Sequence, residues 1–153
     1  MKARAQITVE GRISEAEALW YDTRRWPMFV DGFHHVAGGL EEWPEAGTLV
    51  WDSTQGGRGR VLERVVRYEP RVGQTVEVED EKTTGTQTIA FAGAPGDRVA
   101  VSLEFAYDLK EHRGGSLFSV IDAIFIRPRQ REALNRTLMR LSLIHISEPT
   151  RPY

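Results

Sequence analysis

Hydrophobic and polar residues alternate one by one along much of the middle of the chain. The clearest case is residues 99–109, where Val, Leu, Phe and Tyr at the odd positions are separated by Ala, Ser, Glu and Asp at the even positions. Successive side chains of a strand point to opposite faces of a sheet. The pattern therefore predicts a strand with one apolar face and one largely solvated face.

Similar segments are separated by short clusters of turn residues, such as Gly38-Gly39 and Pro95-Gly96-Asp97. Together with 99–109, the predicted strands are residues 3–9, 33–40, 48–54, 60–68, 75–80 and 86–91. Short connections join antiparallel neighbours. We therefore predict one curved antiparallel sheet of seven strands.

The segment between the first two predicted strands has a helical character. Ser14 precedes Glu17 by three residues, which is the spacing of a capping box and predicts a helix start. The residue before a proline is biased away from the α region, whereas proline itself is well placed in a first helical turn. Because Pro27 follows Trp26, the sequence predicts two short helices that form a V.

Residues 116–140 are predicted to form a long C-terminal helix. One apolar stripe of this helix consists of Leu117, Ile121, Ile124 and Phe125. Leu134 and Leu138 lie roughly a quarter turn from that stripe at about 100° per residue. A kink or break at Pro128 would bring the two sets into line.

Three segments carry a resemblance to a known family. They are L-W-Y-D-T-R-R-W-P-M-F-V-D-G-F (residues 19–33), W-D-S-T-Q-G-G-R-G-R-V (51–61) and V-E-D-E-K-T-T-G-T-Q-T-I-A-F (78–91). With the order of elements, they resemble the START-like (SRPBCC) superfamily, in particular its polyketide cyclase/dehydrase branch. The resemblance implies an α+β helix-grip fold, in which the sheet wraps around the C-terminal helix and a ligand cavity lies between them.

The end of the chain carries a different resemblance. Residues 141–151, L-S-L-I-H-I-S-E-P-T-R, resemble the translation of a transposon-end sequencing adapter. On this basis we expect one START-like domain over residues 1–140 and a non-native tail over 141–153. Foreign segments are excluded from fold reasoning, so no functional role is assigned to the tail.

Composition restricts the class of protein. The 153 residues, 41% hydrophobic and 27% charged, are typical of one soluble globular domain. The net charge of −2, without a basic block, disfavours binding to nucleic acid or an anionic membrane. The sequence shows no signal peptide and no apolar stretch of the roughly 20 residues that a membrane span needs. We therefore expect a cytoplasmic protein without stable membrane insertion, and the oligomeric state stays open.

Candidate metal ligands are few. The chain has no cysteine, which excludes disulfides, thiolate nucleophiles and cysteine metal sites. His34 and His35 are adjacent on a predicted strand, so at most one of them, His35, can face a cavity. His112 lies in a turn-like E-H-R-G-G segment and is expected to be solvated. We expect neither a metal site nor a cofactor.

Two carboxylates and one glycine-rich segment are further candidates. Asp52 and Glu63 would have raised pKa values suited to proton transfer if they faced inward. The sequence does not assign their faces, and a solvated strand surface is the favoured interpretation. Gly56, Gly57 and Gly59 flank Arg58 without the Lys-Ser/Thr of a phosphate loop, and they predict a flexible hairpin near the cavity mouth.

Aromatic residues from the V, the sheet and the long helix make the stronger case for a pocket. Apolar walls with a few polar groups are typical of small-molecule sites. The candidate ligand-binding residues are Trp26, Phe29, Phe33, Trp51, Tyr107, Phe118, Ile121 and Phe125, with Arg64 as an inward polar group. Core packing is the alternative for each of them.

Three functions are consistent with these features. The first is binding, or transfer, of a small hydrophobic or amphipathic molecule, whose polar end would contact Tyr107, His35 or Arg64. The second is a cyclase or dehydratase acting on a carbonyl-rich substrate, with Tyr107, His35 or Asp52 as catalytic candidates. The third is a non-catalytic module that docks a partner protein. A shared fold cannot decide among them.

Overall fold

The computed structural model describes residues 1–110 and 127–147. Its elements are β1 (Lys2–Glu10), α1 (Ile13–Tyr21), η1 (Thr23–Arg25), α2 (Trp26–Phe29), β2 (Phe33–Gly38), β3 (Thr48–Ser53), β4 (Arg60–Glu69), β5 (Gly73–Glu79), β6 (Thr83–Ala94), β7 (Arg98–Leu109) and α4 (Arg127–Ser147). None of the helices in these ranges is both long and apolar enough to cross a membrane.

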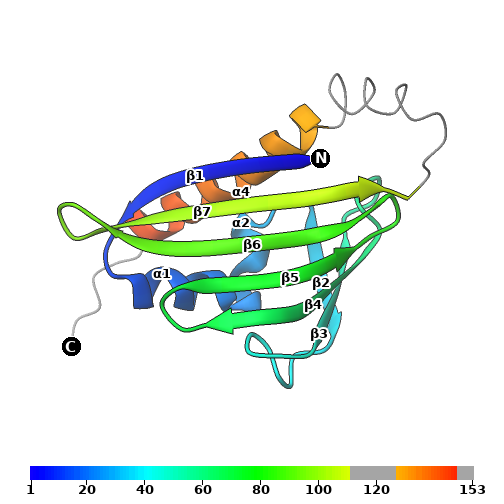
Figure 1. Ribbon diagram of the computed structural model, residues 1–153, viewed down its shortest axis with the longest axis horizontal. Coiled ribbons are helices and arrows are strands. Elements are labelled where there is room, and N and C mark those ends of the chain that lie inside the picture. Colours follow the sequence, from blue (N-terminus) through cyan, green and yellow to red (C-terminus); the bar gives the residue numbers. More distant parts are fainter. Residues whose placement is uncertain (111–126, 148–153) are drawn as a thin grey trace.

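The strands form one antiparallel sheet of seven strands in the order β1-β7-β6-β5-β4-β3-β2. Figure 1 shows this sheet curving in front of α1, α2 and α4. The predicted α+β helix-grip fold is thereby confirmed. The largest difference from the predicted strands is β6, which extends three residues beyond 86–91 at each end and pairs with β7 from Thr83 to Ala94.

The V is present, but its first helix begins differently from the prediction. The N–H of Arg12 donates to Oε1 of Glu15 at 3.0 Å, so the helix starts at Ile13 and Ser14 lies inside it. Glu17 therefore does not cap the helix, and its side chain is buried. The chain then passes through η1 into α2, with Pro27 in the first turn of α2 as the sequence predicts.

The C-terminal helix α4 packs against β1 and α2. Pro128 is its second residue, where the missing N–H has no helical partner to lose; residues 116–126 of the predicted helix lie outside the described residues. The helix continues past the expected boundary at Arg140 to Ser147, and Leu141 joins the core. The foreign origin of residues 141–153 stays a prediction.

The core lies between the helices and the concave face of the sheet. Alternate residues of each strand point into it, as in β7, where Val99, Val101, Leu103, Phe105 and Tyr107 are all buried. The same alternation leaves the intervening residues on the opposite, outer face. The concave face is therefore the surface from which any pocket in the sheet must be built.

A buried carboxylate connects α1 to the turn between β4 and β5. Glu17 is 6% exposed, and its two oxygens accept from the N–H and the guanidinium of Arg71 at 2.8 and 3.0 Å. Arg71 has a φ of 62°, in the left-handed region that favours glycine. The carboxylate of Glu17 thus holds an otherwise unfavourable turn beneath the first helix.

We expect Glu17→Ala to lower the free energy of unfolding by about 2 kcal/mol, because the N–H and the guanidinium of Arg71 lose a buried acceptor. Arg71→Gly should stay within about 1 kcal/mol of the wild type, because glycine keeps the N–H that binds Glu17, relieves the positive φ and removes only a largely exposed guanidinium. Urea denaturation measures both. Equal losses in the two variants would contradict a structural role for the carboxylate.

Candidate functional site

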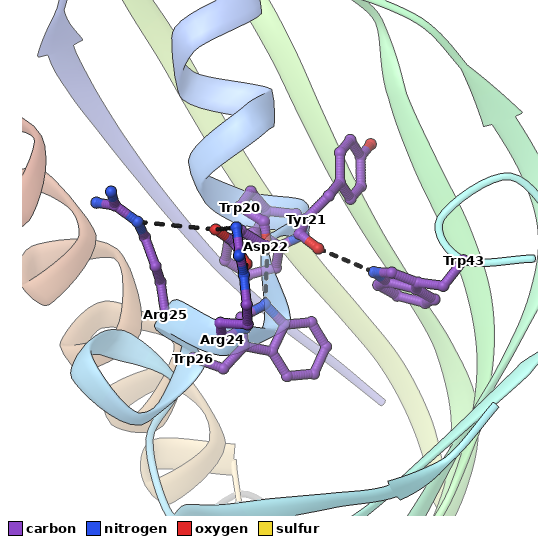
Figure 2. A network of polar contacts seen from close by, with 7 residues as sticks. All are labelled: Trp20, Tyr21, Asp22, Arg24, Arg25, Trp26 and Trp43. Atoms are coloured by element: carbon purple, nitrogen blue, oxygen red, sulfur yellow. Dashed lines mark hydrogen bonds and ion pairs between the residues drawn. The ribbon is translucent and has the colours of Figure 1, made fainter. Parts of the chain in front are cut away.

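Two tryptophan side chains fix the V. The indole N–H of Trp26 donates to the carbonyl oxygen of Trp20 at 2.7 Å, and that of Trp43 donates to the carbonyl oxygen of Tyr21 at 3.1 Å. Figure 2 shows both bonds meeting the C-terminal end of α1, where carbonyl groups lack helical partners. The rings of Trp26 and Trp43 also contact edge to face. The V is therefore held from within by Trp26 and from outside by Trp43, which lies in the connection between β2 and β3.

Asp22 stabilises the step between the two helices. Its carboxylate accepts from the backbone N–H of Arg24 at 3.1 Å and pairs with the side chains of Arg24 and Arg25 (Figure 2). The side-chain hydrogen bond from Arg24 is the main reason why the pKa of Asp22 lies below its ordinary value. The two arginines that precede Trp26 thus stabilise the turn between the two helices through Asp22.

The described residues enclose a pocket of about 490 Å³ between the V, the sheet and α4. This volume lies in the range of small-molecule sites. Its apolar walls are Trp20, Trp26, Val30, Trp51, Leu103, Phe105, Ala133 and Leu134. Its polar side chains include Ser53, Arg58, Glu63, Gln87 and Thr137, and its exposed rim includes Gly56, Gly57, Arg129 and Glu132.

Glu63 is the buried acid of the pocket. It is 5% exposed, and Oε2 accepts from the indole N–H of Trp51 at 2.6 Å. Burial raises the pKa of Glu63 above its ordinary value, and the opposing effects of Trp51 and of the nearby charge of Arg58 do not offset it. The favoured surface position for Glu63 was therefore wrong, because the residue shares the concave face with Val61.

Arg58 is a half-buried cation of the pocket, whereas Arg129 and Arg136 are exposed. Its Nε donates to Oδ2 of Asp80 at 2.8 Å, and its guanidinium carbon lies 5.6 Å from the ring centre of Trp51 and 5.7 Å from that of Phe105. Burial tends to raise the pKa of Asp80, but Arg58 and the N–H groups of Lys82 and Thr83 lower it overall. Arg58 and Asp80 thus form a charged pair against an aromatic wall.

Gly59 explains why Arg58 points inward. Arg60 and Arg64 are exposed on the outer face of β4, and simple alternation would place Arg58 beside them. Gly59 has a φ of 74°, which breaks the alternation just before the strand begins. The arginine of the predicted hairpin therefore lines the pocket.

One corner of the pocket is tied to α4. Asp31, after α2, pairs with Arg136 at 3.1 Å and with Arg140 at 3.2 Å, and its N–H donates to the hydroxyl of Thr137 at 3.0 Å. Burial tends to raise the pKa of Asp31, but the two arginines lower it overall. These contacts join the V to the helix across the sheet's concave side.

The structure brings some of the predicted ligand-binding residues together. Trp26 and Trp51 line the pocket, and Phe33 contacts both rings at 5.7 and 5.5 Å between ring centres. Phe29 is fully buried against Trp20, and Tyr107 is buried and stacked on Phe105. Neither Phe29 nor Tyr107 lines the pocket, so both act as core residues beside it. Phe118, Ile121 and Phe125 lie outside the described residues.

Three other candidates are corrected, because they lie on the outer face of the sheet. His35 is exposed, and its Nε2 lies 3.2 Å from Oδ2 of Asp52, which also binds Arg60. Asp52 follows the inward Trp51, so alternation turns it outward. Arg64 is exposed and pairs with Glu77. None of the three can serve as a polar group of the pocket in this structure.

Side chains that could bind a metal ion do not cluster among the described residues. Among the side chains that the structure describes, residues 1–110 and 129–144, no three His, Asp or Glu are placed to hold a metal ion. His34 and His35 contact each other through Nδ1 at 2.9 Å on the exposed face of β2.

Comparisons with solved structures identify the architecture. The protein TTHA0849 from Thermus thermophilus superposes with a TM-score of 0.77 at 14% identity, over 98% of this chain and 100% of that one. A START superfamily protein from Mycobacterium smegmatis gives 0.71 at 11% identity, over 95% and 97%. This chain has the START-like helix-grip fold. Truncated norcoclaurine synthase from Thalictrum flavum shares that fold, with a TM-score of 0.70 at 9% identity over 97% and 94%.

Sequence comparisons add no closer relationship. No protein-family model matches the chain, and no curated protein matches it. At such low identities the START-like fold is shared, whereas the chemistry of the pocket has to be argued from its own residues.

We expect Glu63→Gln to be stabilising at high pH. A carboxyl whose pKa is raised by folding contributes most below its unfolded value of about 4.5 and loses that contribution as the pH rises through the folded pKa. The difference in unfolding free energy between E63Q and the wild type should therefore increase from pH 4.5 upward and then level off. Urea denaturation across this range measures it.

Glu77→Gln, on the outer face, is the control for loss of a strand carboxylate. Parallel pH profiles for E63Q and the wild type would show that burial does not perturb Glu63.

Proposed function

We propose that the protein binds a small amphipathic molecule in the pocket between the sheet, the V and α4. The observation that carries this proposal is the composition of one cavity of about 490 Å³, in which aromatic walls surround a buried carboxyl and a guanidinium. Removing apolar ligand surface from water would supply most of the affinity. Arg58, Glu63 and Gln87 would orient the polar end.

The same pocket supports catalysis as a second candidate. Glu63 has a raised pKa and lies in the pocket with Arg58, whose charge acts on it. A carboxyl whose pKa is raised suits general acid–base chemistry, and a guanidinium stabilises developing negative charge. Glu63 would replace His35, Asp52 and Tyr107 as the catalytic candidate in a cyclase or dehydratase.

Ala133→Trp tests the binding function. Ala133 lies half-buried on α4 and lines the pocket, so an indole there should occupy the space of a ligand. We expect the variant to bind a neutral apolar fluorophore such as Nile red at least about tenfold more weakly than the wild type, a change of about 1.4 kcal/mol. A fluorescence titration measures the affinity.

Ala92→Trp is the matched control, because Ala92 lies exposed on β6 away from the pocket. This variant should bind the fluorophore as the wild type does. If A133W retained full affinity with an unchanged melting temperature, ligand binding in this pocket would be refuted.

A further inference from the structure

We infer that the pocket selects an uncharged ligand, which presents an oxygen acceptor to the guanidinium of Arg58. This inference rests on the proposed binding function and adds the class of ligand to it. It follows from the number of hydrogen-bond donors on Arg58, from the charges that line the pocket, and from the contacts that already surround the cation.

Most of the N–H donors on the guanidinium of Arg58 have no acceptor among the described residues. A guanidinium carries five N–H groups, and the described residues provide one acceptor for them, the carboxylate of Asp80. Nη2 is buried without a hydrogen-bond partner in the part of the chain that the structure describes. Buried donors without acceptors are costly. Nη2 itself has almost no accessible surface, but the Arg58 side chain is 32% exposed as a whole, and an acceptor oxygen of a ligand would bind to this exposed part of the guanidinium.

The charges around the pocket nevertheless disfavour an anion. Arg58 is paired at 2.8 Å with Asp80, which is 4% exposed, so its charge is already balanced within the protein. The lining holds three arginines and three carboxylic acids, namely Arg58, Arg129, Arg136, Asp31, Glu63 and Glu132. An anionic ligand would bring a further negative charge toward the Arg58–Asp80 pair, whose cation is already balanced, and its desolvation would be only partly compensated.

A cation is disfavoured for a different reason. Aromatic faces attract cations, but the guanidinium of Arg58 already lies over the rings of Trp51 and Phe105. A ligand ammonium group would meet Arg58 at the same wall. Burial also favours the neutral form of Glu63, so its carboxyl is a weaker partner for such a group than an exposed carboxylate would be. An uncharged oxygen is the polar group that this set of residues accommodates.

Four ligands that share one ring system test the inference: ethylnaphthalene, acetylnaphthalene, naphthoate and naphthylmethylammonium. Their affinities for the wild type are measured near neutral pH by competition with Nile red. We expect the ketone to bind about tenfold more tightly than the hydrocarbon, the effect of one hydrogen bond to a charged group. The two charged compounds should bind at least about tenfold more weakly than the ketone.

Asp80→Asn provides a test by gain of function. Without the charge of Asp80, Arg58 becomes an unbalanced cation, and naphthoate should gain at least about tenfold in affinity relative to acetylnaphthalene. Asp52→Asn is the matched control, because Asp52 pairs with Arg60 at 2.9 Å on the outer face. It should leave the order of the four ligands unchanged.

The outcomes separate the inference from the proposed function. Tightest binding of naphthoate or of the ammonium compound to the wild type, or equal binding of ketone and hydrocarbon, would overturn the inference while binding in the pocket stands. An equal gain for naphthoate in D80N and D52N would also overturn it. If none of the compounds competed and A133W bound Nile red normally, both proposals would fail.

Discussion

The site depends on one constraint, the removal of Glu63 from water on an apolar sheet surface. An isolated ionised carboxylate in such a place is very costly, so its neighbours must provide hydrogen bonds or it must bind a proton. Trp51 provides a hydrogen bond at 2.6 Å, and burial favours the proton. Arg58 stays close but directs its Nε to Asp80. This arrangement permits polar groups inside an aromatic pocket without a net charge.

Much of the fold could be predicted from the sequence, because the residues that one face of a sheet buries are apolar and recur at every second position of a strand. The strand over residues 99–109 and the restart of the helix at Pro27 are examples. The predicted helix start at Ser14 was wrong, because Glu15 and not Glu17 is the acidic residue that caps the first turn. Which of them caps the helix depends on a distant partner, since Arg71 draws Glu17 into the core.

The candidate site was predicted less completely. Strict alternation of side chains along a strand places Asp52 on the face opposite the inward Trp51. It places Glu63 on the same face as Val61. The sequence therefore contained the signal for Glu63, although a carboxylate on a strand usually faces solvent. It contained no comparable signal for Arg58, because the direction of that side chain follows from the positive φ of Gly59 and from the pairing with Asp80, 22 residues along the chain.

The contacts of Asp31 with α4 bear on how quickly a ligand would enter and leave the pocket. Ion pairs with partly exposed arginines contribute about 0–1 kcal/mol and are screened by salt. These ion pairs therefore contribute little beside the about 5–15 kcal/mol that unfolding a domain typically needs, and the packing of α2 against α4 supplies the rest of the contact at this corner. For a ligand that passes this corner, ionic strength would change the rate of entry and exit, whereas the aromatic walls would govern how tightly the ligand is held. Residence time and affinity would be adjustable independently of each other.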